Sequence, residues 1–80
     1  MKTYFFKVVL SEEDGVWIAV VPALPGCNAQ ENTKEAVLTA IQDTTHAYIE
    51  TLIEDGEPIP VEEETVKNPL EVPVVSVVVV

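Results

Sequence analysis

The stretch VPALPGCNAQENTKEA, residues 21–36, decides the fold, because the chain turns there between an apolar run and a helical pattern. The preceding run VWIAVV, residues 16–21, predicts a strand, since β-branched and aromatic residues favour extended backbone. Pro22 has no N–H to donate to a neighbouring strand and should end this one. Pro25 fixes φ and Gly26 allows a positive φ. We therefore expect the chain to reverse direction within this stretch.

The apolar period changes after the turn. Residues 27–31 predict a short, more polar third strand, and a helix should follow it. Thr33 is the predicted N-cap, and Glu35 is favourable in the first turn because of the helix dipole. Gly56 is placed where a C′ glycine would end the helix. One long amphipathic helix is predicted, with its apolar stripe made of Val37, Ala40, Ile41, Thr44, Tyr48 and Leu52.

The rest of the chain supplies two more predicted strands. Residues 4–10 predict the first, which a DG turn joins to the second. Residues 57–70 predict an extended acidic linker, and residues 72–80 a last strand. The order β-β-β-α-β indicates an α+β fold, with an antiparallel three-strand meander and a fourth strand parallel to the first and beside it. Residues 1–80 should form a single domain, arranged like the first part of ribonuclease-H-like domains.

The predicted strands are apolar on both faces, although only one helix is available to cover them. A sheet with a solvated face should alternate apolar and polar residues, and residues 16–21 do not. Uncovered apolar surface marks an interface, so we expect a homo-oligomer, a dimer or a tetramer. The alternative is that the linker folds back over this face. The candidate interface residues, which should point away from the helix, are Phe5, Val9, Ile18 and Val20.

The chain is strongly acidic, with 14 acidic residues against 4 basic ones and a formal charge of −10. This charge repels nucleic acid and anionic membranes, because both are polyanions, and it suits a basic protein partner. Alternatively, it only keeps an apolar domain soluble. The N-terminus carries no secretory signal and one cysteine cannot form an internal disulfide, so a cytoplasmic setting is expected. The longest purely apolar run, VVVV, is too short to span a bilayer.

Residues that could carry chemistry are few. A reactive Cys27 would need a basic neighbour or a helix N-terminus, and none lies near it in sequence, so a structural role is expected. His46, the only histidine, falls on the polar face of the predicted helix. One histidine and one cysteine give no metal-ligand spacing, and no phosphate-binding loop is present. Ribonuclease-H-like nucleases need a carboxylate on the first strand, which is missing here. We expect no catalytic residue, no metal and no cofactor.

In order and spacing, these pieces resemble the HicB-like antitoxin family. That family's pattern is a Val-Pro-x-Leu-Pro-Gly-Cys turn, a short strand, a Thr-x-Glu-Ala helix start and a Gly-x-x-Ile-Pro helix exit. The resemblance spans most of residues 1–60 and implies a partial, catalytically empty ribonuclease-H-like fold in which the motif turns the chain. The matching positions are Val21, Pro22, Leu24, Pro25, Gly26, Cys27, Thr33, Glu35, Ala36, Gly56, Ile59 and Pro60.

For function, the resemblance implies neutralisation of a small basic RNA-cleaving toxin of the HicA type. Family members commonly carry a C-terminal DNA-binding domain. Since this chain ends in VPVVSVVVV with no basic segment, a short form without that domain is expected. The alternative is a stand-alone oligomeric binding module with no cognate toxin, and an enzyme is the third hypothesis. A neighbouring gene for a small basic protein would favour the first of these, and its absence the second.

Overall fold

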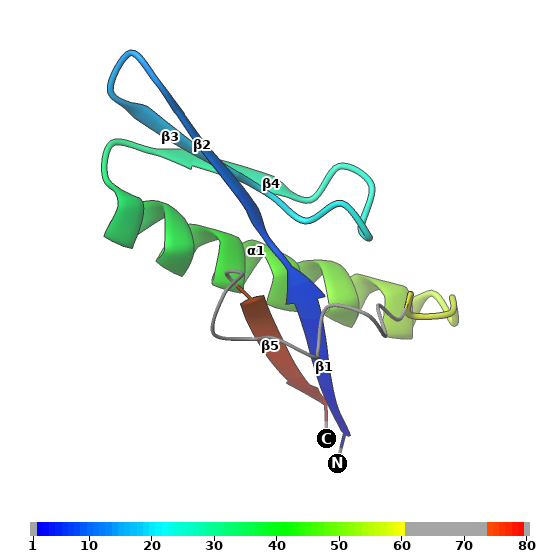
Figure 1. Ribbon diagram of the computed structural model, residues 1–80. Coiled ribbons are helices and arrows are strands. Elements are labelled where there is room, and N and C mark those ends of the chain that lie inside the picture. Colours follow the sequence, from blue (N-terminus) through cyan, green and yellow to red (C-terminus); the bar gives the residue numbers. More distant parts are fainter. Residues whose placement is uncertain (1, 61–73, 80) are drawn as a thin grey trace.

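A computed structural model describes residues 2–60 and 74–79 of the chain (Figure 1). One long helix packs across strands that belong to two small sheets. The predicted meander, helix and last strand are all present, although the predicted first strand is divided in two. The elements in chain order are β1 (Lys2–Lys7), β2 (Val9–Glu13), β3 (Val16–Val20), β4 (Asn28–Glu31), α1 (Lys34–Glu54) and β5 (Val74–Val79).

The division of the first strand sends the chain into both sheets. β2, β3 and β4 form the antiparallel meander, whereas β1 pairs only with β5. Inward and outward positions nevertheless continue to alternate across the break, because Phe6 and Val8 are both buried, with 0% and 2% of their surface exposed. Extended backbone places alternate side chains on opposite faces, so β1 and β2 present one continuous inner face to the core.

The predicted direction of the last strand is wrong. β5 runs antiparallel to β1, with Lys7 opposite Val74 and Lys2 opposite Val79. A run of β-branched residues favours extended backbone but does not specify the direction of pairing. Direction depends on which end of β1 the returning chain reaches, and here it enters beside Lys7. The ribonuclease-H-like description stays a prediction.

Local chemistry sets both ends of α1. The Thr33 side chain accepts a hydrogen bond from the Ala36 N–H at 3.1 Å, which confirms the predicted N-cap. At the other end Gly56 has φ +69°, and the Glu57 N–H donates to the Leu52 carbonyl at 2.9 Å. This is a Schellman ending, and it confirms Gly56 as C′.

The buried stripe of α1 is centred differently from the predicted one. Thr45 and Ile49 are fully buried although neither was in the predicted stripe. Thr44, Tyr48 and Leu52 lie half-buried at its side. Because apolar residues occur on both flanks of the stripe, the sequence pattern does not fix its centre, and a threonine is not recognised as a core residue. The buried helix residues are Val37, Ile41, Thr45 and Ile49.

The core lies between α1 and the inner faces of both sheets. α1 contacts β3, β4 and β5, so one helix spans the two sheets. In residues 2–60 and 74–79, no helix combines the length and apolar character that crossing a membrane requires. Of the linker predicted at residues 57–70, only residues 57–60 are among the described residues, and the remainder lies outside them. The buried apolar residues are Phe6, Val8, Ala19, Val21, Leu24, Cys27, Val37, Ile41, Ile49, Val75 and Val77.

Candidate protein-interaction surfaces

The turn at residues 21–27 is a closed loop held by its own backbone. The Val21 N–H donates to the Cys27 carbonyl at 3.0 Å, which joins the two ends of the loop. Within it, Leu24 N–H donates to the Val21 carbonyl and Cys27 N–H donates to the Leu24 carbonyl, each at 3.0 Å. Gly26 has φ +81°, a left-handed conformation that glycine adopts without strain.

Two contacts hold this loop against α1. The Tyr48 hydroxyl donates to the Pro25 carbonyl at 2.9 Å. Cys27 Sγ lies 3.5 Å from Thr45 Oγ1, and the Cys27 side chain is only 1% exposed. Cys27 is thus a buried packing residue. The contacts made by Thr45 and by the Tyr48 hydroxyl were not predicted from the sequence. The only sequence feature that indicates them is a polar atom on or beside the apolar face of the helix.

The other motif positions lie in the core, at turns or at the ends of α1, with Val21 and Leu24 buried. Thr33 caps α1, while Glu35 and Ala36 are exposed in its first turn. Pro22, Pro25, Gly26 and Gly56 are exposed at turns, and Ile59 and Pro60 are half-buried. His46 is turned to the surface, where Nδ1 lies 3.2 Å from Glu50 Oε1. Within the part of the chain that the structure describes, no three histidine, cysteine, aspartate or glutamate side chains are grouped closely enough to hold a metal ion.

Apolar side chains lie exposed on the sheet face away from α1. Val9 and Val20 are directly opposite each other in the β2–β3 register and are 48% and 39% exposed. Ile18 is half-buried two residues along β3. We call Val9, Ile18 and Val20 the outer patch. Phe5 is 42% exposed but lies on β1, in the other sheet, opposite Ser76. Three of the four predicted interface residues therefore lie together, and their role in an interface stays a prediction.

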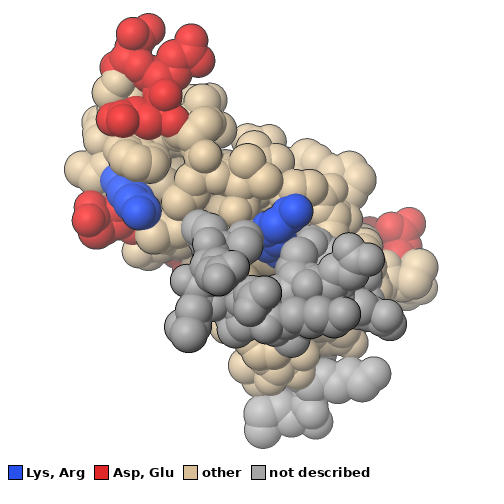
Figure 2. Space-filling model, viewed as in Figure 1, with Lys and Arg blue, Asp and Glu red and all other residues tan. Residues whose placement is uncertain are grey.

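Acidic side chains gather at the tip of the β2–β3 hairpin, as Figure 2 shows at the top of the view. Glu12, Glu13 and Asp14 are exposed there. Asp14 and Gly15 have φ values of 53° and 80°, as a two-residue type I′ turn requires, which confirms the hairpin that the DG dipeptide predicted. This tip projects away from α1 (Figure 1).

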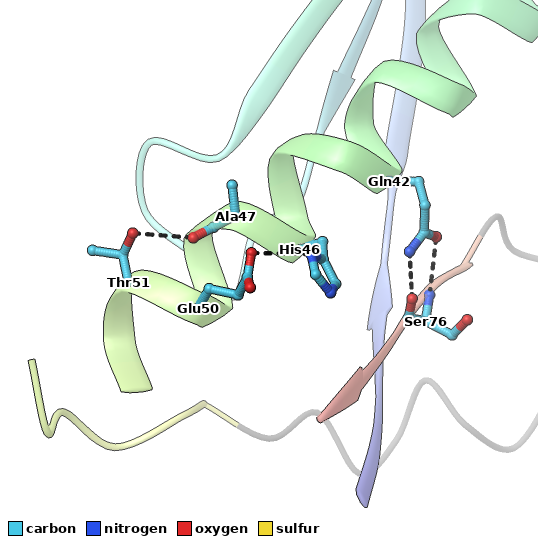
Figure 3. A network of polar contacts seen from close by, with 6 residues as sticks. All are labelled: Gln42, His46, Ala47, Glu50, Thr51 and Ser76. Atoms are coloured by element: carbon cyan, nitrogen blue, oxygen red, sulfur yellow. Dashed lines mark hydrogen bonds and ion pairs between the residues drawn. The ribbon is translucent and has the colours of Figure 1, made fainter. Parts of the chain in front are cut away.

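A third surface lies where α1 overhangs the edge of β5. Gln42 reaches from α1 to the backbone of Ser76, where Nε2 donates to the carbonyl and Oε1 accepts the N–H at 3.3 Å (Figure 3). A cavity opens on each side of this contact. The first, about 450 Å³, is lined by Leu38, Thr39, Gln42, Asp43, Val74 and Val75. The second, about 460 Å³, is lined by His46, Ile49, Glu50, Ile53, Glu54, Val77 and Val78.

Comparison with known proteins identifies the family. Residues 5–79 match the family described as the HicB-like antitoxin of bacterial toxin–antitoxin systems. The chain belongs to this family, which confirms the resemblance based on the motif positions. Among its relatives is the UPF0150 protein Ta0767 of Thermoplasma acidophilum, which is 44% identical over 53 residues, or 66% of this chain and 77% of that protein.

Solved structures share the fold. The N-terminal domain of the antitoxin HicB from Burkholderia pseudomallei superposes with a TM-score of 0.68 at 25% identity, covering 95% of this chain and 98% of that one. A chain of the HicA3 and HicB3 toxin–antitoxin complex superposes with a TM-score of 0.62 at 16% identity, covering 92% and 95%. The meander, the helix and a last strand beside β1 are therefore the architecture of a HicB N-terminal domain.

Proposed function

We propose that residues 1–80 act as one binding domain that holds a small basic HicA-type toxin and blocks the surface with which that toxin binds RNA. The match to the antitoxin family over residues 5–79 carries this proposal. A second support is the neighbour of the same fold that comes from a HicA3 and HicB3 complex. The chain's charge of −10 is a third, because an RNA-binding surface is basic.

Charge gives the proposed interaction a kinetic signature. An acidic protein steers a cationic partner towards itself and raises the association rate, and it competes with RNA for the same basic surface. Salt screens this steering, with a Debye length of about 8 Å at physiological ionic strength. Association should therefore slow as salt rises, whereas dissociation depends on buried contacts and should change less.

The test begins with any small basic protein encoded beside this chain. The two should co-purify, and this chain should inhibit RNA cleavage by the partner. Stopped-flow association rates measured across a salt series should fall steeply, with little change in the dissociation rate. If such a neighbour exists and this chain neither binds nor inhibits it, the antitoxin role is wrong.

We also propose that the chain is itself non-catalytic and acts in the cytoplasm. Its family and its UPF0150 relatives support a binding role. The purified chain should not cleave single- or double-stranded RNA with or without divalent metal. Cleavage that a point substitution within this chain abolishes would contradict the proposal.

A stand-alone oligomeric binding module is the second candidate function, and the exposed outer patch favours it. Val9 and Val20 form an exposed apolar pair on a sheet face that α1 does not cover. A search for a small basic partner distinguishes the two functions, because only the antitoxin role requires one.

A further inference from the structure

The edge of β5 that faces away from β1 carries backbone groups able to pair with another strand. In an antiparallel pair, the N–H and C=O of one residue point to the same side, and successive residues alternate sides. The Ser76 N–H and C=O point outward, since both bond to Gln42. The same groups of Val74 and Val78, two residues away on either side, must therefore also point outward.

The space beside this edge is hollowed on both sides of Gln42. The two cavities continue along β5 on both sides of Gln42, beneath the flank of α1. Apolar side chains from α1 and β5 form part of their walls, and two of these, Ile53 and Val78, remain 44% and 47% exposed. The Gln42 amide bonds the Ser76 backbone as one peptide unit of an added strand would. A strand entering here would displace that amide and pair with three outward residues.

The charge around this edge selects the occupant. Asp43, Glu50 and Glu54 line the two cavities and are exposed, and the lining residues include no lysine or arginine. Asp43 and Glu54 can each hold a lysine or arginine of a bound segment, and Glu50 can do so beside its contact with His46. A second copy of this chain fits this edge poorly, because its own β5 offers no basic side chain to these carboxylates.

We propose that the edge of β5 beneath α1 binds an extended, cationic segment of the basic partner by β-strand addition. Backbone hydrogen bonds to Val74, Ser76 and Val78 would supply affinity, and the apolar pockets and carboxylates would select alternating apolar and basic side chains. That the segment comes from a basic partner protein rests on the proposed function. That this edge binds an extended cationic segment does not.

A synthetic peptide of alternating lysine and valine tests the edge without the partner. Titration followed by amide NMR should shift Ser76 and Val78 most, and the outward amides of Val74 and Val78 should become protected from hydrogen exchange. A peptide of alternating glutamate and valine has the same β propensity and should bind far more weakly. Equal binding of both peptides, or shifts confined to other surfaces, would overturn the proposal.

Two variants separate strand addition from simple charge attraction. Val78→Pro removes an outward N–H that β1 does not use, so the fold should survive and peptide affinity should fall at least about fivefold. Val78→Thr keeps the N–H and is the matched control. Gln42→Ala removes the competing amide and should bind the peptide roughly threefold tighter. Exchange protection of Val75 and Val77, whose amides face β1, checks that β5 stays paired.

Charge variants locate the carboxylates that matter. The double substitution Glu50→Gln with Glu54→Gln should weaken binding of the lysine–valine peptide several-fold. Glu12→Gln with Glu13→Gln removes the same charge at the hairpin tip and should leave binding nearly unchanged. If both pairs weaken binding equally, only net charge attracts the peptide and the edge proposal is wrong.

The partner itself separates this proposal from the proposed function. If a neighbouring basic protein binds this chain, Val78→Pro should weaken the complex and Val78→Thr should not. Tight binding that both variants retain would leave the antitoxin role intact and overturn the edge proposal. If no basic protein binds but the lysine–valine peptide protects Val74 and Val78, the antitoxin role fails and the edge chemistry stands.

Discussion

Cys27 and Thr45 meet inside the core, 3.5 Å apart, where a weak thiol hydrogen bond links the motif turn to α1. Cys27→Ser should retain this contact as a hydroxyl pair and lower the free energy of unfolding by only about 1 kcal/mol. Adding Thr45→Val would leave the new serine buried without that partner, at a further cost of roughly 1–3 kcal/mol. Urea denaturation of the double-mutant cycle measures the coupling. Additive costs, or rapid alkylation of the Cys27 thiol in the folded protein, would contradict a structural cysteine.

Gly26 contributes through its backbone alone. Its φ of +81° lies in the left-handed region, and a Cβ added there would meet nothing within 4 Å. Gly26→Ala should therefore cost about 1–2 kcal/mol from backbone strain without any steric clash. Gly26→Asn should cost less, because asparagine tolerates this conformation. Denaturant midpoints with an unchanged m-value are the measurement, and an alanine variant as stable as the parent would disprove the strain.

At the scale of elements, the N-cap of α1 offers a direct test of local chemistry. Thr33→Ala removes the acceptor for the Ala36 N–H and should lower the free energy of unfolding by about 1 kcal/mol. Thr33→Ser keeps the hydroxyl and should change the free energy of unfolding little. Thermal unfolding followed by circular dichroism compares the two. Equal losses in both variants would show that packing, and not the hydrogen bond, accounts for the effect.

Features that depend on neighbouring residues could be predicted from the sequence, whereas features that depend on distant residues could not. The DG hairpin, the Thr33 cap and the Gly56 ending depend on a few neighbouring residues, and all were predicted correctly. The direction of β5 depends on where the chain returns to β1, and the bridge from Gln42 to Ser76 joins residues 34 positions apart. Neither leaves a local pattern. The outer patch lies between these cases. The two-residue period of a strand correctly placed Ile18 and Val20 on one face, but it gave no sign that the first strand divides and that Phe5 belongs to the other sheet.

For the whole molecule, the outer patch predicts self-association. Ile18→Glu or Val20→Glu would place a charge within the apolar patch and should shift the equilibrium from oligomer to monomer. Ala47→Glu adds the same charge at an exposed position on α1 and serves as the control. Light scattering at micromolar concentration measures the mass, which should be at least twice that of the chain for the parent and for the control. A monomeric parent protein would rule out the self-associating surface.

The pairing of β1 with β5 also bears on the order of folding. These strands lie at opposite ends of the described chain, so their contact closes a far longer loop than the β2–β3 hairpin does. Long loops carry a larger entropic cost, and distant pairings form slowly. The hairpin, the motif turn and α1 can therefore assemble first, with β5 docking last. The edge of β5 then becomes available to a partner only after the rest of the domain has folded, which would couple partner binding to completion of the fold.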